Sequence, residues 1–429
     1  MLERVFDLRG HGTDLRTELL AGITTFLTMA YIAFVNPAIL SAAGMDFGAV
    51  FVATCVSAAI GTLIMGVYAN YPIALAPGMG LNAFFAYGVV LGLGHSWQTA
   101  LGAVFIAGVL FVVLSVLPVR EWIINAIPQS LKLAISAGIG LFLALIALKN
   151  AGIVTDHPAT LVSMGDLTAP GAYLALAGFI AIAALHYRRV PGAVIIGILA
   201  VTAIGIVFGI SEFKGIAALP PSPMPTLLAM DIAGALNLAL ASVIFTFLFV
   251  DLFDTAGTLI GVAHRARLLD AQGRLPRLKR ALIADSAATV IGAGLGTSPV
   301  TSYIESAAGT NVGGRTGLTA VVVAAAFVLC LFFAPLAGTV PGYATAPALL
   351  FVACLMTRGL AELPWDDVTE YVPGVLAAVA MPLTFSIADG IGLGFVSYAL
   401  IKILSGRGGE CSPAVMVIGV LFIVKFALA

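Results

Sequence analysis

Two aspartates, Asp251 and Asp254, lie within one helical turn of each other in a stretch that otherwise reads as membrane-spanning. The surrounding residues, LFVDLFDTAGTLIG, are apolar or small, and no basic residue follows until His264 and Arg265. A charged side chain at mid-bilayer costs roughly 3 kcal/mol on insertion scales. Carboxyl groups in such a place indicate substrate binding or proton transfer, because burial disfavours their charged form and lets them exchange a proton near neutral pH.

A third carboxylate, Glu305, lies in a segment too rich in Gly, Ser and Thr for an ordinary lipid-facing helix, GLGTSPVTSYIESAAGTNVGG (294–314). Neither Asp254 nor Glu305 has a cationic partner at helical spacing, so an internal ion pair does not explain them. A purely structural hydrogen-bonding role is the alternative for both. We therefore expect a binding site or proton relay built on these two residues.

A matching broken segment, YPIALAPGMGLNAFFAYG (71–88), occurs in the first half of the chain. Asn82 offers hydrogen-bond donors and an acceptor to the edge of a heterocycle, and Phe84 and Phe85 can stack on a planar ligand. The alternative is that Asn82 caps a helix and the phenylalanines face lipid. Matching interruptions in two halves indicate a transporter site at a repeat interface.

The remaining acidic residues of the apolar spans are open to plainer interpretations. Asp251 shares a helix face with Asp254, so it can share a proton with it or support it from behind. Asp389, in TFSIADGIG, precedes a glycine and fits either a proton-coupling residue or a turn between two short spans. Asp285 lies one turn after a basic loop and is expected to be an interfacial residue that pairs with Arg280.

The amino-acid composition indicates that the chain is embedded in a lipid membrane. Of its 429 residues, 61% are hydrophobic and 10% are charged, whereas soluble domains carry about 25% charged residues. So little polar surface cannot cover so large an apolar core. We expect an all-α polytopic membrane protein without a soluble domain.

Counting apolar stretches of about 20 residues predicts about fourteen transmembrane segments, with the two broken ones included and the C-terminal piece 412–428 left open. The stretches lie near 19–41, 47–69, 99–118, 130–149, 170–186, 191–210, 234–262, 280–296, 317–338, 343–357, 372–386, 389–404 and 412–428. Non-helical backbone at membrane depth requires cover from protein or a cavity, so the extended pieces of the two broken segments should pair with each other.

Basic residues collect in 118–122, 186–192, 264–280 and 402–408, whereas loops such as 151–166 are nearly free of them. The positive-inside rule places these basic loops and the N-terminal residues 1–18 in the cytoplasm. Residues 1–18 have no basic-then-apolar leader, so we expect no cleavable signal peptide.

Several other classes of function find no support. The four cysteines are scattered, which indicates neither a zinc site nor a disulfide framework, and we expect no metal. No phosphate-binding loop, zinc-protease or nucleophile-elbow motif is present, so an enzyme is not expected. A net charge of −1 does not favour nucleic acid as a partner.

Four motifs together resemble the nucleobase/ascorbate transporter family (nucleobase:cation symporter-2), and most closely its hypoxanthine/guanine/adenine permease branch. They are APGMGLNAFFAYG, VDLFDTAGTLIG, GTSPVTSYIESAAGTNVGGRTGLTA and PLTFSIADGIGLGFVSY, and the likeness extends over the whole chain. The resemblance implies fourteen segments in two inverted repeats of seven, with short strands in segments 3 and 10. It also implies a core domain that holds substrate and a gate domain that usually dimerises.

By the same resemblance, the family's two base-binding acids fall on Asp254 and Glu305 and its polar residue in segment 3 falls on Asn82. Xanthine and uric acid members carry Gln-type residues in segment 10, so Glu305 favours hypoxanthine, guanine or adenine. The full candidate set for substrate is Asp254, Glu305, Asn82, Phe84, Phe85, Thr258, Ser302 and Ile304. The candidates for proton coupling or support are Asp254, Glu305, Asp251 and Asp389.

The expected division is a first repeat at 19–210 and a second at 234–404, with core and gate interleaved. The apolar piece 412–428 lies beyond the last segment that the family pattern provides.

We expect a proton-coupled purine nucleobase carrier of the inner membrane, homodimeric, with an elevator-like motion and no cofactor besides the proton. The rival interpretations are a sulfate- or bicarbonate-like anion carrier of the same fold and, less favoured, a channel. Two acidic residues facing an anion would repel it.

Overall fold

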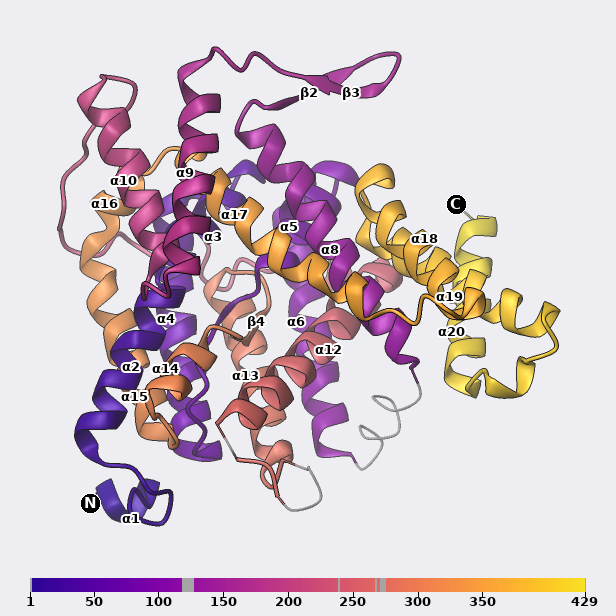
Figure 1. Cartoon of the computed structure of the whole chain (residues 1–429), viewed down its shortest axis with the longest axis horizontal. Helices are drawn as coiled ribbons and strands as arrows, with labels where there is room; N and C mark the ends of the chain where they lie inside the picture. Colours follow the sequence, from indigo (N-terminus) through magenta and orange to yellow (C-terminus); the bar gives the residue numbers. More distant parts are fainter. Residues whose placement is uncertain (1, 118–126, 238–239, 267, 271–274, 429) are drawn as a thin grey trace.

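The structure, a computed structural model, describes residues 2–117, 127–237, 240–266, 268–270 and 275–428 (Figure 1). Nine helices in these ranges are long and apolar enough to cross a membrane, and four shorter apolar helices accompany them. The predicted polytopic helical architecture is confirmed. The predicted basic loops at 118–122 and 264–280 lie wholly or partly outside the described residues.

Three helices in the first half of the chain begin at capping side chains. Its elements are α1 (Leu2–Phe6), α2 (Leu15–Met29), α3 (Ile32–Ala42), α4 (Phe47–Ile64), η1 (Met65–Ala69), β1 (Leu75–Pro77), α5 (Met79–Ala83), η2 (Phe84–Gly92), α6 (Trp97–Val116), α8 (Gln129–Asn150), β2 (Val154–His157), β3 (Leu161–Met164), α9 (Pro170–Tyr187) and α10 (Ala193–Val207). Asp14, Asp46 and Ser96 accept hydrogen bonds from the first free N–H groups of α2, α4 and α6. These caps supply partners that the backbone lacks at a helix start.

The second half repeats the pattern of long helices around a broken segment. It comprises α11 (Ile232–Ala235), α12 (Ala241–Arg265), α13 (Leu278–Leu295), β4 (Val300–Ser302), α14 (Ser306–Val312), α15 (Gly317–Cys330), η4 (Leu331–Phe333), α16 (Ala334–Thr339), α17 (Gly342–Thr357), η5 (Arg358–Glu362), α18 (Val368–Thr384), α19 (Ile387–Leu404), η6 (Gly408–Glu410) and α20 (Pro413–Leu428). The piece 412–428, whose topology the family pattern left open, is thus a helix that packs on α19.

The two broken segments pair as expected. Strands β1 and β4 lie antiparallel, with Ala76 opposite Thr301. The N–H of Gly78 donates to the Pro299 carbonyl at 2.9 Å, which extends the pairing by one residue. Each strand leads into a short helix, α5 or α14. The pairing provides hydrogen-bond partners for backbone groups, which lipid tails cannot provide.

A second small sheet was not predicted. Strands β2 and β3 form an exposed hairpin within 151–166, at the end of the molecule opposite the N-terminus (Figure 1). This hairpin and the N-terminus therefore lie beyond opposite ends of the helices.

The helices form two groups, and each packs mainly within itself. Helices α2, α4, α6, α12, α13, α14 and α15 make one group; α8, α9, α10, α17, α18 and α19 make the other. Strand β1 packs against α4, and β4 packs against α12 and α13. The paired strands therefore belong to the first group. The division into core and gate domains and the residue boundaries of the repeats stay predictions.

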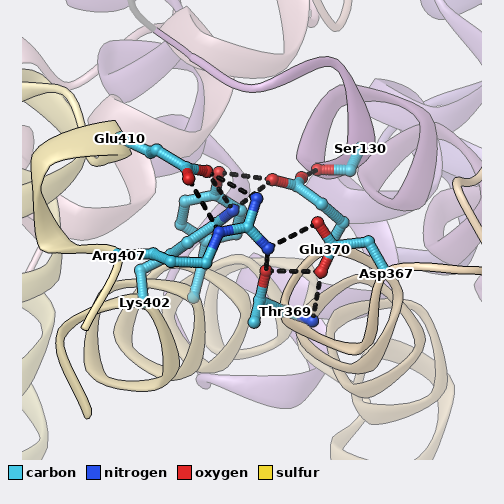
Figure 2. A network of polar contacts seen from close by, with 8 residues as sticks. Ser130, Asp367, Thr369, Glu370, Lys402, Arg407 and Glu410 are labelled. Carbon is cyan, nitrogen blue, oxygen red and sulfur yellow. Dashed lines mark hydrogen bonds and ion pairs between the residues drawn. The ribbon is translucent and has the colours of Figure 1, made fainter. Parts of the chain in front are cut away.

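An ionic network ties together the ends of α18 and α19 (Figure 2). Lys402 is fully buried in α19 and pairs with Glu370 at 2.8 Å and Glu410 at 2.9 Å. Arg407 pairs with Asp367 and Glu410, each at 2.7 Å. The predicted basic loop at 402–408 was wrong at its start, because Lys402 lies within α19, which ends at Leu404.

Candidate functional site

Asp254 is exposed although it lies midway along α12. One turn later, a Cβ atom added at Gly257 would meet no atom within 4 Å, and one at Gly261 would meet only the side chain of Ile304, at 3.6 Å. The stripe of α12 that carries Asp254 therefore borders open space instead of a packed helix. Asp254 makes no hydrogen bond or ion pair with any residue that the structure describes.

Glu305 lies at the start of α14 and is half-buried. Its Oε1 accepts a hydrogen bond from the Tyr31 hydroxyl at 2.5 Å, and its Oε2 has no partner among the described residues. Helix α14, which begins directly after Glu305, packs against α12, which carries Asp254. Two carboxylates with acceptor oxygens that no described residue occupies, and with no neutralising cation in the described part of the chain, have the chemistry to bind N–H donors or a proton.

Asn82 lies at the fourth position of α5 and is fully buried. Its Nδ2 donates to Asn36 Oδ1 at 3.0 Å, and its Oδ1 has no partner in the described part of the chain. It does not cap α5, whose N-cap residue is Gly78. One acceptor of this buried amide is thus unsatisfied within the described residues.

Asn36 connects the two broken segments. Its Nδ2 donates to Thr54 at 2.8 Å and to Thr297, just before β4, at 2.9 Å. Since both N–H hydrogens of Asn36 are thus occupied, its Oδ1 must be the atom that accepts from Asn82. A single buried amide therefore links α5, α4 and the approach to β4.

The two phenylalanines after Asn82 are buried and do not face lipid. Phe84 is 1% exposed and packs edge-on against Phe247 of α12, with the ring centroids 5.0 Å apart, and Phe85 is fully buried. The alternative that they provide lipid-facing bulk was wrong. The Phe84 ring thus packs the first broken segment against α12.

Asp251 and Asp254 do not share an environment, although one turn separates them. Asp251 is 2% exposed and accepts a hydrogen bond from Thr289 of α13 at 2.9 Å. Side chains three residues apart differ in direction by about 60° around a helix. This difference places Asp251 against α13 and Asp254 next to open space. The predicted common face was therefore wrong, and the role of Asp251 stays a prediction.

Asp285 is not an interfacial partner of Arg280. It is fully buried and accepts hydrogen bonds from Thr255 and Ser302, both at 2.7 Å. Ser302, a candidate for substrate contact, thus spends its hydroxyl hydrogen on Asp285. The guanidinium of Arg280 instead lies 5.7 Å from the ring centroid of Tyr68.

The remaining candidates lie in different places. Thr258 is buried on α12 at 7% exposure, whereas Ile304 is 47% exposed next to Gly261. Asp389 lies in the first turn of α19 and pairs with Lys425 of α20 at 2.6 Å. None of the contacts of Asp389 joins it to Asp254 or Glu305 within the described ranges.

Sequence reasoning missed three polar residues of the first span: Tyr31, Asn36 and Glu18. Tyr31 is 1% exposed at the break between α2 and α3. Glu18 is fully buried and accepts from the backbone of Arg315, Thr316 and Thr319 and from the Thr319 hydroxyl. The sequence does carry a signal for Asn36, because it is a polar side chain inside an apolar run, next to Pro37. Tyr31 carries no such signal, because a single tyrosine is common in an apolar span.

Comparison with known proteins is consistent with this geometry. Residues 16–393 match the model of the Permease family. The adenine permease AdeP of Escherichia coli is 52% identical over 99% of this chain and 96% of its own length. The guanine/hypoxanthine permease PbuO of Bacillus subtilis is 45% identical over 98% and 99%, respectively.

Among solved structures, the transmembrane domain of the cyanobacterial bicarbonate transporter BicA superposes with a TM-score of 0.67. The match covers 89% of this chain and 97% of that domain at 17% identity, so it shows a common fold. The relatives named above are permeases, which establishes that the chain is a transporter and not an enzyme, and the predicted kinship with nucleobase permeases is confirmed. The chain belongs to the Permease family, as a multi-pass membrane transporter related to the adenine and guanine/hypoxanthine permeases.

Proposed function

We propose that the protein takes up purine nucleobases together with protons. The observation that carries the proposal is the pair Asp254 and Glu305, which offer free carboxylate oxygens next to open space and have no cationic partner among the described residues. A neutral base presents ring N–H donors to such acceptors, and a proton relieves the repulsion between the two charges.

The identity of the base is supported by relatives whose names specify adenine and guanine/hypoxanthine. The carboxyl groups of Asp254 and Glu305 supply acceptors, and the free Oδ1 of Asn82 supplies another. The rival, an anion carrier, shares the fold of the bicarbonate transporter but would place an anion beside two carboxylates. The acidic site therefore favours the base.

The transport cycle that we propose moves the first helix group, with the paired strands, past the second group. Each group packs mainly within itself, which is the packing expected of two bodies that shift as units. We further propose an inner-membrane location with a cytoplasmic N-terminus, and a homodimer formed through the second group.

Competition for uptake tests the substrate class. Cells that lack their own purine uptake and express this protein should accumulate radiolabelled hypoxanthine. Unlabelled adenine, guanine and hypoxanthine are expected to compete, and uracil and sulfate are not. Strong competition by sulfate, with none by the purines, would establish the anion carrier instead.

A further inference from the structure

A layer of four residues joins α12 to α13 behind the proposed site. Asp251 accepts from Thr289 at 2.9 Å, and one turn along each helix Thr255 donates to Asp285 at 2.7 Å. Each helix thus contributes one aspartate and one threonine, four residues apart. We propose that within this layer Asp285 is the carboxylate, and Asp251 is an uncharged, protonated acid that positions strand β4.

Asp285 has the partners that a carboxylate requires. Its Oδ2 accepts from Thr255 and its Oδ1 from Ser302, both at 2.7 Å. The Thr255 oxygen lies 2.8 Å from the Thr301 hydroxyl, which can supply the hydrogen for that contact. Every hydroxyl hydrogen is then used once, and no proton on Asp285 is needed.

The hydroxyl groups of Thr289 and Thr301 both lie near Asp251. The Thr301 hydrogen is directed to Thr255, so the remaining hydroxyl hydrogen does not suffice unless Asp251 carries a proton of its own. Thr289 has a single hydroxyl hydrogen but two acceptors at 2.9 Å, Asp251 Oδ2 and the carbonyl of Val300 in β4. The Oδ1 of Asp251 is buried and has no partner in the described ranges. If Asp251 is protonated, its O–H donates to Thr289, and the Thr289 hydrogen is free for Val300.

The first broken segment shows where such a threonine directs its hydrogen. Thr62 of α4 donates to the carbonyl of Leu75 at 3.0 Å and accepts from the Leu75 N–H at 2.8 Å. Leu75 is the first residue of β1, as Val300 is the first residue of β4. A threonine in the helix preceding each strand therefore holds that strand, and Thr289 does so only if its hydrogen goes to Val300.

The charges around α12 offer no alternative partner for an ionised Asp251. The titratable or charged groups on α13 are Asp285, Lys279 and Arg280, and Tyr303 and Glu305 directly precede α14. Helix α19 carries Asp389, Tyr398 and Lys402. Lys132 on α8 is 5.4 Å from the Phe253 ring centroid, and Asp254 is on α12 itself. No ion pair joins any of them to Asp251 within the described residues. A buried charge without a cation is costly, and such a group becomes neutral instead.

Asp251 thus acts on the site through Thr289 and β4. Strand β4 runs from Val300 to Ser302 and leads directly to Glu305. Asp251 is therefore a positioning residue: it keeps the second broken segment in place without touching the base. This inference builds on the proposed transport function, and a spectroscopic test separates the two.

The test compares Asp251→Asn with Asp285→Asn. An asparagine amide can donate to Thr289 as the protonated acid does, so Asp251→Asn should keep accumulation of hypoxanthine within about fivefold of wild type, the effect of about 1 kcal/mol. Its pH profile of uptake should be unchanged. Asp285→Asn places an amide where two hydroxyls donate, and it should lose uptake by tenfold or more, since leaving buried polar groups mismatched costs roughly 1–3 kcal/mol.

Infrared spectroscopy of the purified protein reads the proton directly, whether or not a variant transports. Wild type should show the carbonyl band of a protonated carboxyl group that persists across the pH range of transport and disappears in Asp251→Asn. Thr289→Val removes the partner and should shift this band to higher frequency, whereas Thr289→Ser should leave it in place. Thr289→Ser should also retain uptake that Thr289→Val loses.

Two results would overturn the proposal. One is a wild-type spectrum without a protonated-carboxyl band that depends on Asp251. The other is an Asp251→Asn protein that binds base but no longer accumulates it, which would mean that Asp251 ionises during the cycle. Absence of purine uptake by wild type would contradict the proposed function and leave the infrared assignment intact.

Discussion

The hydroxyl of Tyr31 donates a hydrogen bond to Oε1 of Glu305 at 2.5 Å, which joins the break between α2 and α3 to the start of α14. The two residues are 274 positions apart in the chain, and each lies where a helix is interrupted or begins. The contact occupies Oε1 of Glu305, and no residue that the structure describes occupies Oε2. Tyr31 thus orients one acceptor of the proposed site and leaves the other for substrate.

Removing this hydroxyl should weaken purine binding. A hydrogen bond to a charged group contributes roughly 1.5–3 kcal/mol, so Tyr31→Phe should raise the Kd for hypoxanthine by roughly tenfold to hundredfold. Equilibrium binding to purified protein measures the effect. Tyr187, which is 88% exposed, provides the matched control, because Tyr187→Phe should bind as wild type does. Unchanged affinity in Tyr31→Phe would show that Glu305 needs no such orientation.

Substitutions at Gly257 should affect purine binding without lowering the stability of the protein. A Cβ atom added at Gly257 would meet no atom within 4 Å, and alanine is favoured over glycine in a helix by about 1 kcal/mol. The Tm of Gly257→Ala should therefore be no lower than that of wild type. Gly257→Leu should fill the space next to Asp254 and lower purine affinity. At Gly317, by contrast, a Cβ would lie 1.8 Å from the Gly66 carbonyl oxygen, so Gly317→Ala should lower the Tm. If Gly257→Leu binds purines as tightly as wild type does, the base does not bind in the space next to Asp254.

The ionic network at the ends of α18 and α19 gives a pH prediction. Hydrogen bonds from Thr369 and Arg407 lower the pKa of Asp367 to about 2, and Arg407 and Lys402 lower the pKa of Glu410 to about 2. Because both folded pKa values lie below the usual value of about 4 for carboxyl groups, the stabilisation is complete above about pH 4 and disappears as the pH falls toward 2.

Arg407→Gln should therefore lower the Tm in detergent at pH 7. The difference from wild type should shrink as the pH falls from about 4 toward 2, where the carboxylates of both proteins become protonated. Melting curves over this range measure it. A difference that is constant with pH would show that Arg407 stabilises the region by packing alone.

The sequence predicted the frame of the site because the two broken segments carry strong local signals. Pro77 and Pro299 stand near small-residue runs in otherwise apolar spans, and unpaired backbone in lipid must find a partner. The pairing of β1 with β4 follows from that constraint. The carboxylates Asp254 and Glu305 were recognisable because charge within an apolar span is rare.

The supporting contacts could not be predicted, because they depend on which helices pack together. Nothing along the chain relates Tyr31 to Glu305 or Asn36 to Thr297. Asp285 follows a basic loop and resembles an interfacial residue until the packing of α13 on α12 buries it. The β2–β3 hairpin also gave no clear signal, since its strands are exposed and lack a buried face with alternating side chains.

The central claim is that Asp254 and Glu305 bind the base and couple its uptake to protons. Accumulation of radiolabelled hypoxanthine driven by an imposed proton gradient, in proteoliposomes containing Asp254→Asn or Glu305→Gln, tests it most directly. Both variants should insert in normal amounts and fail to concentrate the base. Wild-type accumulation driven by the gradient in both variants would contradict the account.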